Sequence, residues 1–122
     1  MSSLTGPVRI VGAGLLGTSI GLALTKQGVD VIITSQSTKS VDLAVEYGAG
    51  RVAKPGDVPT LIVVCVPPQL TAKIISEELS TFPDAFVTDV ASVKASILNE
   101  LISLGAPIER YVGSHPMAGR ER

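Results

Sequence analysis

The sequence predicts a single α/β domain in which helices cover both faces of a doubly wound parallel sheet, the Rossmann-type arrangement. Short runs of β-branched and other apolar residues alternate along the chain with segments whose apolar residues recur at helical spacing. The connections between the runs are too long for hairpins, so right-handed crossovers between parallel strands are expected. A glycine-rich turn follows the first apolar run, and neither a repeat nor a linker divides the 122 residues, so one domain over 1–122 is expected.

The first half of the chain predicts three strands and two helices. The expected strands are 8–12, 29–35 and, as a short one, 51–53, and the helices between them are 14–28 and 39–48. The residues expected to lie on the buried faces of these two helices are Leu16, Ile20, Ala23, Val41, Ala44 and Val45. Gly28 and Gly48 are placed to end the helices, because glycine adopts the left-handed conformation that often follows a helix.

The second half predicts three further strands, each of the first two followed by a helix. The expected strands are 61–66, 85–90 and 111–115. The first of them is almost continuously apolar, as expected of a central parallel strand covered on both faces. Pro67 and Pro68 suit the first turn of the next helix, and Ser92 suits the cap of a helix that runs to about residue 104. The buried positions expected on these two helices are Leu70, Ile74, Ile75, Val93, Ile97, Leu101 and Leu104.

Composition excludes several classes of function. The formal net charge is −1, aromatic residues make up 3 % and tryptophan is absent, so the sequence predicts no binding to nucleic acid or to an anionic membrane. The N-terminus has no secretory pattern, and the longest apolar run falls short of the roughly 20 residues that span a bilayer. Cys65 is the only cysteine, which fits a small buried hydrophobe and a cytoplasmic location. His115 is the only histidine and lies far from Cys65 in sequence, so no metal site is expected.

The turn "VGAGLLG" predicts a dinucleotide-binding site. Gly12, Gly14 and Gly17 form a Gly-x-Gly-x-x-Gly pattern between the first strand and the first helix, with Leu15 and Leu16 inside it. In such a loop the first glycine permits a tight turn, the second lets the backbone approach a pyrophosphate, and the third lets the helix pack close to the sheet. The pattern alone is a weak signal, but it gains specificity when it opens a strand–helix–strand unit.

The residues after the second strand bear on which dinucleotide binds. An NAD-binding domain has an acidic residue here, about 20 residues beyond the glycine loop, to hold the ribose 2′-hydroxyl. This sequence has no carboxylate there; the residues at this place are Ser35, Gln36, Ser37, Thr38 and Lys39. Hydroxyls and an ammonium group suit a 2′-phosphate, so NADP is the expected cofactor. The alternative is an ordinary polar loop with NAD as the cofactor.

A second group of polar residues follows the later strands. Val66 and Pro67 end the fourth expected strand, where apolar and backbone atoms suit contact with a cofactor. Ser92 and Lys94 follow the fifth strand, and His115 ends the sixth. Ligands of open α/β sheets bind beyond the carboxyl ends of the strands, so these residues are candidates for a site. Each also has a structural alternative, since Ser92 suits a helix cap and Lys94 a solvated side chain.

The segments "GAGLLGTSIGLAL", "VVCVPP", "VTDVASVKASILNEL" and "GSHPMAG", in this order and spacing, resemble the amino-terminal domain of prephenate/arogenate dehydrogenases. The resemblance implies oxidative decarboxylation of a cyclohexadienyl substrate, with hydride leaving the hydroxyl-bearing ring carbon for the nicotinamide and loss of the ring carboxylate restoring aromaticity. By the same resemblance, His115 would accept the hydrogen bond or proton of the reacting hydroxyl. Ser92 would orient that hydroxyl, and Lys94 would support the site.

Family members continue into a helical domain that completes the substrate pocket and forms a homodimer. This chain is therefore expected to be the cofactor-binding part, which binds dinucleotide without useful turnover by itself. Whether the substrate is prephenate or arogenate stays open. Two alternative functions stay open: the protein is another dehydrogenase of the β-hydroxyacid or imine-reducing group, or it is a noncatalytic NAD(P)-sensing module.

Overall fold

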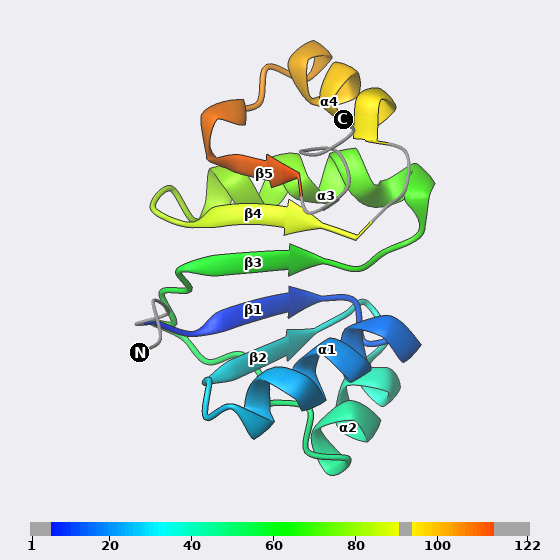
Figure 1. Cartoon of the computed structure of the whole chain (residues 1–122), viewed down its shortest axis with the longest axis vertical. Coiled ribbons are helices and arrows are strands. Elements are labelled where there is room, and N and C mark those ends of the chain that lie inside the picture. The colour runs from blue at the N-terminus through cyan, green and yellow to red at the C-terminus, as the bar shows by residue number, and fades with distance from the viewer. Residues whose placement is uncertain (1–5, 91–93, 114–122) are drawn as a thin grey trace.

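The computed structural model describes residues 6–90 and 94–113 and contains a five-stranded parallel sheet (Figure 1). The strand order is β2-β1-β3-β4-β5, and every pairing between neighbours is parallel. The strands are β1 (Val8–Val11), β2 (Val31–Thr34), β3 (Leu61–Val64), β4 (Phe86–Asp89) and β5 (Tyr111–Gly113). The helices are α1 (Leu15–Lys26), α2 (Thr38–Glu46), α3 (Pro68–Thr81) and α4 (Lys94–Ser103), with a short 3-10 helix η1 (Ile108–Arg110) before β5.

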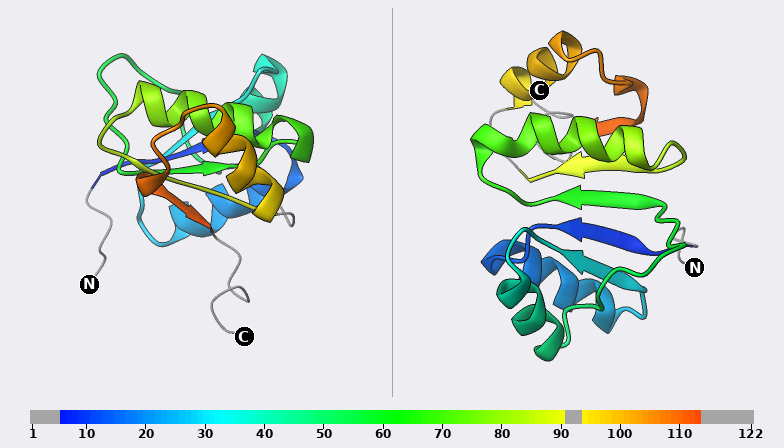
Figure 2. Two further views of the ribbon diagram at one scale, coloured as in Figure 1. Left: turned by 90° about the horizontal axis from the view of Figure 1, so that it is seen from above. Right: turned by 180° about the vertical axis from the view of Figure 1, so that it is seen from behind.

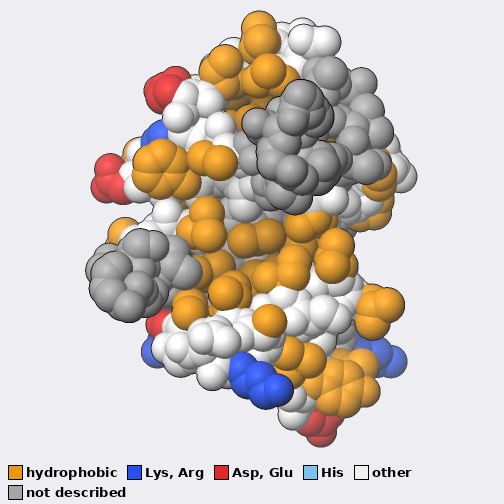
Figure 3. All heavy atoms as spheres, viewed as in Figure 1, with side chains coloured by type: hydrophobic (Ala, Val, Ile, Leu, Met, Phe, Trp, Pro, Cys, Tyr) orange, Lys and Arg blue, Asp and Glu red, His pale blue; other side chains and the backbone are white. Residues whose placement is uncertain are grey.

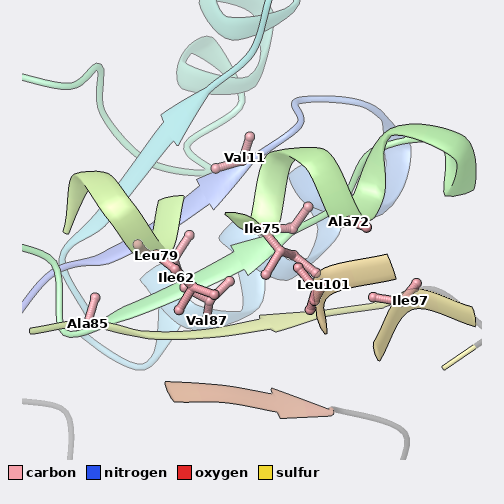
Figure 4. Packing of buried hydrophobic residues seen from close by; sticks show 10 residues of the cluster. Val11, Ile62, Ala72, Ile75, Leu79, Ala85, Val87, Ile97 and Leu101 are labelled. Atoms are coloured by element: carbon pink, nitrogen blue, oxygen red, sulfur yellow. The ribbon is translucent and has the colours of Figure 1, made fainter. Parts of the chain in front are cut away.

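Helices lie on both faces of the sheet, which confirms the doubly wound α/β fold (Figure 2). On one face, α1 and α2 pack against β1 and β2; their buried cluster includes Ile10, Ile33, Val41 and Ala44. On the other face, α3 and α4 pack against β3 and β4, where side chains from both layers meet in one apolar cluster (Figure 4). The members of this second cluster with no exposed surface at all are Ile62, Ile75, Leu79, Ala85, Val87 and Leu101.

The prediction of a strand at 51–53 is wrong, because only one residue of this segment pairs with the sheet. The segment nevertheless lies where a Rossmann sheet has its third strand. Arg51 makes a single parallel bridge to Ile32, on the far side of β2 from β1. This is the place of the third strand in a 3-2-1-4-5-6 sheet. The run cannot lengthen because Pro55 has no N–H to donate and Gly56 turns the chain with φ +90°.

The buried face of α1 also differs from the expectation. Leu16 is 51 % exposed and Ala23 is exposed, and only Ile20 of the three predicted residues packs, half-buried, against the cluster. The buried residues of the helix are Gly17 and Gly21. A Cβ atom on Gly21 would lie 2.4 Å from the carbonyl oxygen of Ala49. The helix therefore lies too close to its neighbours for larger side chains on its inner face, and the leucines take flanking positions.

The other helices present the faces that their periodicity predicts. The buried residues confirmed are Val41, Ala44, Ile75, Ile97 and Leu101. Val45 and Ile74 are half-buried, and Leu70 is exposed in the first turn of α3. Leu104 is exposed because it follows the end of α4, and Val93 lies outside the described residues. Among the helices described, none is both long and apolar enough to cross a membrane.

Helix boundaries follow the residues that predict them. Gly28 and Gly48 have φ values of +85° and +93° directly after α1 and α2, the left-handed conformation expected at a helix end. Pro67 caps α3 and Pro68 is its first residue, where a missing N–H costs no helical hydrogen bond. Ser92, expected to cap α4, lies outside the described residues.

Among residues 6–90 and 94–113, helices cover β4 and β5 on one face, and no described helix lies on the other face of these two strands. Hydrophobic side chains gather across the middle of the opposite face, beside α1 (Figure 3). Phe86 of β4 is 51 % exposed and Val112 of β5 is 49 % exposed. Parallel sheets are ordinarily covered on both faces, so this region has the character of a surface that packs against further polypeptide.

Candidate nucleotide-binding site

A pocket of about 260 Å³ lies where the carboxyl ends of β1, β2 and β3 meet. Its floor is the turn between β1 and α1, residues 11–14, and one wall is formed by Ser35 and Gln36 after β2. The other wall runs from Cys65 to Pro67 and continues with Leu70 and Ile74 of α3. We call this the glycine-loop pocket. It lies at the edge of the sheet where open α/β folds bind their ligands.

Two of the three loop glycines are required by the protein's own packing. Gly12 has φ +116°, and a Cβ atom there would lie 2.1 Å from the carbonyl oxygen of Cys65, the residue after β3. A Cβ atom on Gly17 would lie 1.9 Å from the carbonyl oxygen of Gly12. Both distances are far below any van der Waals contact. These two glycines therefore set the turn and bring α1 against the sheet.

Gly14 is different, because no contact within the described part of the chain requires a glycine there. Its φ is an ordinary −78°, and a Cβ atom built on it would meet nothing within 4 Å. The residue lines the glycine-loop pocket and caps α1, whose first turn carries no acidic side chain. The first N–H groups of a helix have no partner inside the helix, and with the helix dipole they attract anions. The space beside Gly14 thus fits the close approach of a diphosphate, which an added methyl group would block.

Leu15 and Leu16, placed at the cofactor by the motif, do not line the pocket. Their side chains are 90 % and 51 % exposed at the start of α1. What these two residues offer at the pocket mouth is their backbone N–H groups, which belong to the first turn of the helix.

The segment after β2 is organised by serine hydroxyls. The Ser37 backbone N–H donates to Ser35 Oγ, and the Ser40 N–H donates to Ser37 Oγ, each at 3.2 Å. Both hydroxyl oxygens act as acceptors in these bonds, so each hydroxyl hydrogen stays available to a ligand oxygen. Ser35 lines the pocket beside Gln36, whereas Ser37 and the exposed residues Thr38 and Lys39 lie just beyond it, in the first turn of α2.

The apolar wall of the pocket contains two residues that the sequence predicts in the buried core. Val66 and Pro67 line the pocket, where the sequence placed them. Leu70 and Ile74 also line the pocket, whereas their helical spacing predicts that they are buried in the core. The helix α3 begins four residues after the end of β3, so residues at i and i+4 of its first turns face the crevice. That position in the chain is the signal that would have identified them.

Cys65 behaves as a weakly reactive thiol. It is half-buried between β3 and the pocket, and burial, with a smaller contribution from the Asp89 charge, raises the pKa of its thiol to about 11. The side chain is therefore neutral at physiological pH, as expected of a small hydrophobe. Within residues 6–90 and 94–113, no three His, Cys, Asp or Glu side chains come together in a way that would hold a metal ion.

The residues expected to act on the substrate fall largely outside what is described. Ser92 and His115 lie outside the described residues, and Lys94 is the first residue of α4, described by its backbone alone. The strands that lead to them are described. β4 and β5 pair in parallel, with Asp89 opposite Gly113 at their carboxyl ends.

Asp89 is a buried acid whose place the sequence did not reveal. Its side chain has 0 % exposure, and Oδ1 accepts a hydrogen bond of 2.6 Å from the Tyr111 hydroxyl of β5. Burial of the phenol, together with this bond to a carboxylate, raises the pKa of Tyr111 far above its usual value. Tyr111 is therefore a hydrogen-bond donor at every physiological pH.

The doubly wound sheet, the glycine turn and the pocket beside Gly14 define the nucleotide-binding domain of a dehydrogenase, a class that takes NAD(P). The family described as prephenate dehydrogenase, nucleotide-binding domain, matches residues 20–122. The chain belongs to this family.

Three relatives show the same relationship. A probable prephenate dehydrogenase of Streptomyces niveus, NovF, is 43 % identical over 111 residues, which are 91 % of this chain and 31 % of that protein. The crystal structure of Synechocystis arogenate dehydrogenase matches with a TM-score of 0.70 and 30 % identity over 80 % of this chain and 37 % of that one. A putative prephenate dehydrogenase from Corynebacterium glutamicum matches with a TM-score of 0.74 and 27 % identity over 93 % and 37 %. The chain thus spans about a third of the length of these relatives.

Proposed function

We propose that this chain is the cofactor-binding part of a prephenate or arogenate dehydrogenase that prefers NADP. The observation that carries the proposal is the pocket beside Gly14, built as a dinucleotide site in a chain of this family. The 43 % identity to a probable prephenate dehydrogenase supports the substrate class. The half-exposed Phe86 and Val112 support a further helical domain that packs on the sheet, completes the substrate pocket and forms a homodimer. A cytoplasmic location belongs to the same proposal.

Three segments would hold the dinucleotide: the glycine turn, the residues after β3 and the segment from Ser35 to Lys39. The turn from Gly12 to Gly17 would bind the diphosphate through backbone N–H groups, including those of Leu15 and Leu16. Val66 and Pro67 would pack against the cofactor with apolar atoms. NADP⁺, when bound, supplies the acceptor for the hydride that leaves the hydroxyl-bearing ring carbon of the substrate.

The preference for NADP rests on the segment from Ser35 to Lys39. Ser35 and Ser37 keep their hydroxyl hydrogens for a phosphate oxygen, and Gln36 and Thr38 add polar groups beside them. Lys39 brings a positive charge in the first turn of α2, where the helix dipole also favours an anion. A carboxylate in this segment would repel a 2′-phosphate, and the segment contains none.

Replacing Lys39 by alanine is expected to weaken NADP⁺ binding roughly five- to tenfold, the value of one charge-assisted contact at an exposed site. Binding of NAD⁺, which has no 2′-phosphate, should stay unchanged. Isothermal titration calorimetry at one fixed ionic strength measures both, with Lys26→Ala at the far end of α1 as the matched loss of charge. Equal weakening of NAD⁺ and NADP⁺, or a parent chain that prefers NAD⁺, would contradict the assignment.

The proposed chemistry on the substrate uses three residues. His115 would take the proton of the reacting hydroxyl, a role that suits an imidazole because its pKa lies near working pH. Ser92 would donate to or accept from the same hydroxyl and so orient it, and Lys94 would support this arrangement. In the net reaction the substrate, as its carboxylate, loses a hydride and carbon dioxide. The hydroxyl proton that His115 takes returns to the phenolate oxygen as the ring becomes aromatic.

Replacing His115 by alanine in the full-length protein is expected to lower kcat by roughly 10²–10⁴, the usual contribution of a general base. Dinucleotide affinity should stay unchanged, because the glycine-loop pocket is built from β1, β2, β3 and α3. Steady-state kinetics with prephenate and with arogenate measure the effect and identify the substrate. Unimpaired activity of the variant would favour another dehydrogenase of the β-hydroxyacid or imine-reducing group. A parent protein that binds NADP⁺ and turns over neither acid would favour a sensing module.

A further inference from the structure

Among the described residues, a partly buried side-chain hydrogen bond ties the edge strand β5 to its neighbour β4. β5 has three residues and lies at the end of the sheet, where β4 is its strand neighbour. Tyr111, its first residue, packs against the apolar cluster under α3 and α4. Its hydroxyl donates to Asp89 Oδ1 at 2.6 Å, and Asp89 is the last residue of β4. Asp89 is fully buried and Tyr111 is half-buried, and a hydrogen bond to a carboxylate that is shielded from water is among the stronger side-chain interactions in a protein.

The bond joins β4 and β5, the two strands after which the chain continues to Ser92 and His115. Asp89 stands three residues before Ser92, and Tyr111 stands four residues before His115. Asp89 also lies opposite Gly113 in the strand register, so the bond crosses the β4–β5 pair at its carboxyl end. A three-residue edge strand has few backbone hydrogen bonds with which to resist slipping or tilting.

We propose that Tyr111 and Asp89 are positioning residues that fix the spacing between the carboxyl ends of β4 and β5, from which the chain continues to Ser92 and His115. This inference rests on the proposed function, because it assigns the pair to the placement of that reaction's residues. Neither Tyr111 nor Asp89 lines the glycine-loop pocket, so we expect the pair to affect the reaction of the substrate and not the binding of the dinucleotide. Displacing a reacting group by about 1 Å costs up to about a hundredfold in rate, so a tether at this place matters for kcat.

The test is the Tyr111→Phe variant of the full-length protein, which removes one hydroxyl and keeps the ring that packs in the core. We expect kcat to fall roughly tenfold while the dissociation constant of the dinucleotide stays within about twofold of the parent value. The chain contains one other tyrosine, Tyr47, which is exposed just after α2. Tyr47→Phe removes the same atom away from β4 and β5 and is expected to change neither constant.

Dinucleotide affinity also reports whether the Tyr111→Phe protein is folded, because the glycine-loop pocket exists only in the folded sheet. A folded variant with the parent kcat would overturn the positioning role and leave the proposed function standing. A loss of dinucleotide affinity equal to the loss of kcat would also overturn it, since the bond would then support the whole domain. A parent protein inactive on both cyclohexadienyl acids would overturn the proposed function and, with it, the positioning role.

Discussion

Replacing Gly14 by alanine is expected to weaken dinucleotide binding by about a hundredfold, or roughly 3 kcal/mol, and to leave the fold intact. The added methyl group meets no atom of residues 6–90 and 94–113 within 4 Å, and the backbone at this position has an ordinary φ of −78°. Stability should change by less than about 1 kcal/mol, the usual difference between glycine and alanine at a helix cap. The methyl group does occupy the space through which the diphosphate would reach the first N–H groups of α1.

Calorimetric titration with NADP⁺ measures the affinity, and urea unfolding of the same sample measures the stability. Ser19→Ala serves as the control, since Ser19 is an exposed residue of α1 outside the pocket lining. Undiminished binding in Gly14→Ala would mean that the dinucleotide does not approach this turn. A variant that loses its stability would mean that Gly14 is needed by the protein itself.

Replacing Gly17 by alanine is expected to destabilise the fold, unlike the replacement of Gly14. A Cβ atom on Gly17 would lie 1.9 Å from the carbonyl oxygen of Gly12, and a backbone atom cannot move aside as a side chain can. Relieving the contact requires α1 to shift away from the sheet, which loosens the packing of the helix. We expect Gly17→Ala to reduce the free energy of unfolding by about 3 kcal/mol, at the upper end of ordinary overpacking.

For a domain of this size that loss lowers the melting temperature by on the order of 10 °C, which circular dichroism detects directly. Gly14→Ala is the matched control, because it adds the same methyl group to the same loop without a contact. If both variants melted together with the parent, the close packing of α1 on the sheet would be wrong. The pair of substitutions thus separates the glycine that serves the fold from the glycine that serves the ligand.

The fold was predictable because its signals are local. Apolar runs of β-branched residues become strands, and Gly28 and Gly48 end helices through backbone conformations that glycine adopts easily. Two predictions were wrong, the buried face of α1 and the strand at 51–53, because they depend on tertiary contacts that the periodicity of the sequence does not specify. The face of α1 is set by how closely Gly17 and Gly21 let the helix approach, and the segment at 51–53 stops at one bridge because of the residues after it.

The site was predictable in part for the same reason. The glycine loop and the polar residues after β2 are contiguous motifs, and the structure places Gly12, Gly14, Ser35 and Gln36 around one pocket. Leu70 lines the pocket because the first turn of α3 lies beside it, and helical spacing alone does not show this. The bond between Tyr111 and Asp89 depends on the register of two strands 22 residues apart, which no local pattern specifies.

The central claim is that a dinucleotide binds in the glycine-loop pocket, and the most direct test is NMR of ¹⁵N-labelled chain titrated with NADP⁺. We predict that the largest amide shifts occur at Gly12, Gly14, Leu15, Ser35 and Gln36, which form or adjoin the pocket floor and one wall. Amides of β5, such as that of Val112, should move little. A folded sample whose shifts do not change, or change chiefly at β5 and α4, would contradict the claim.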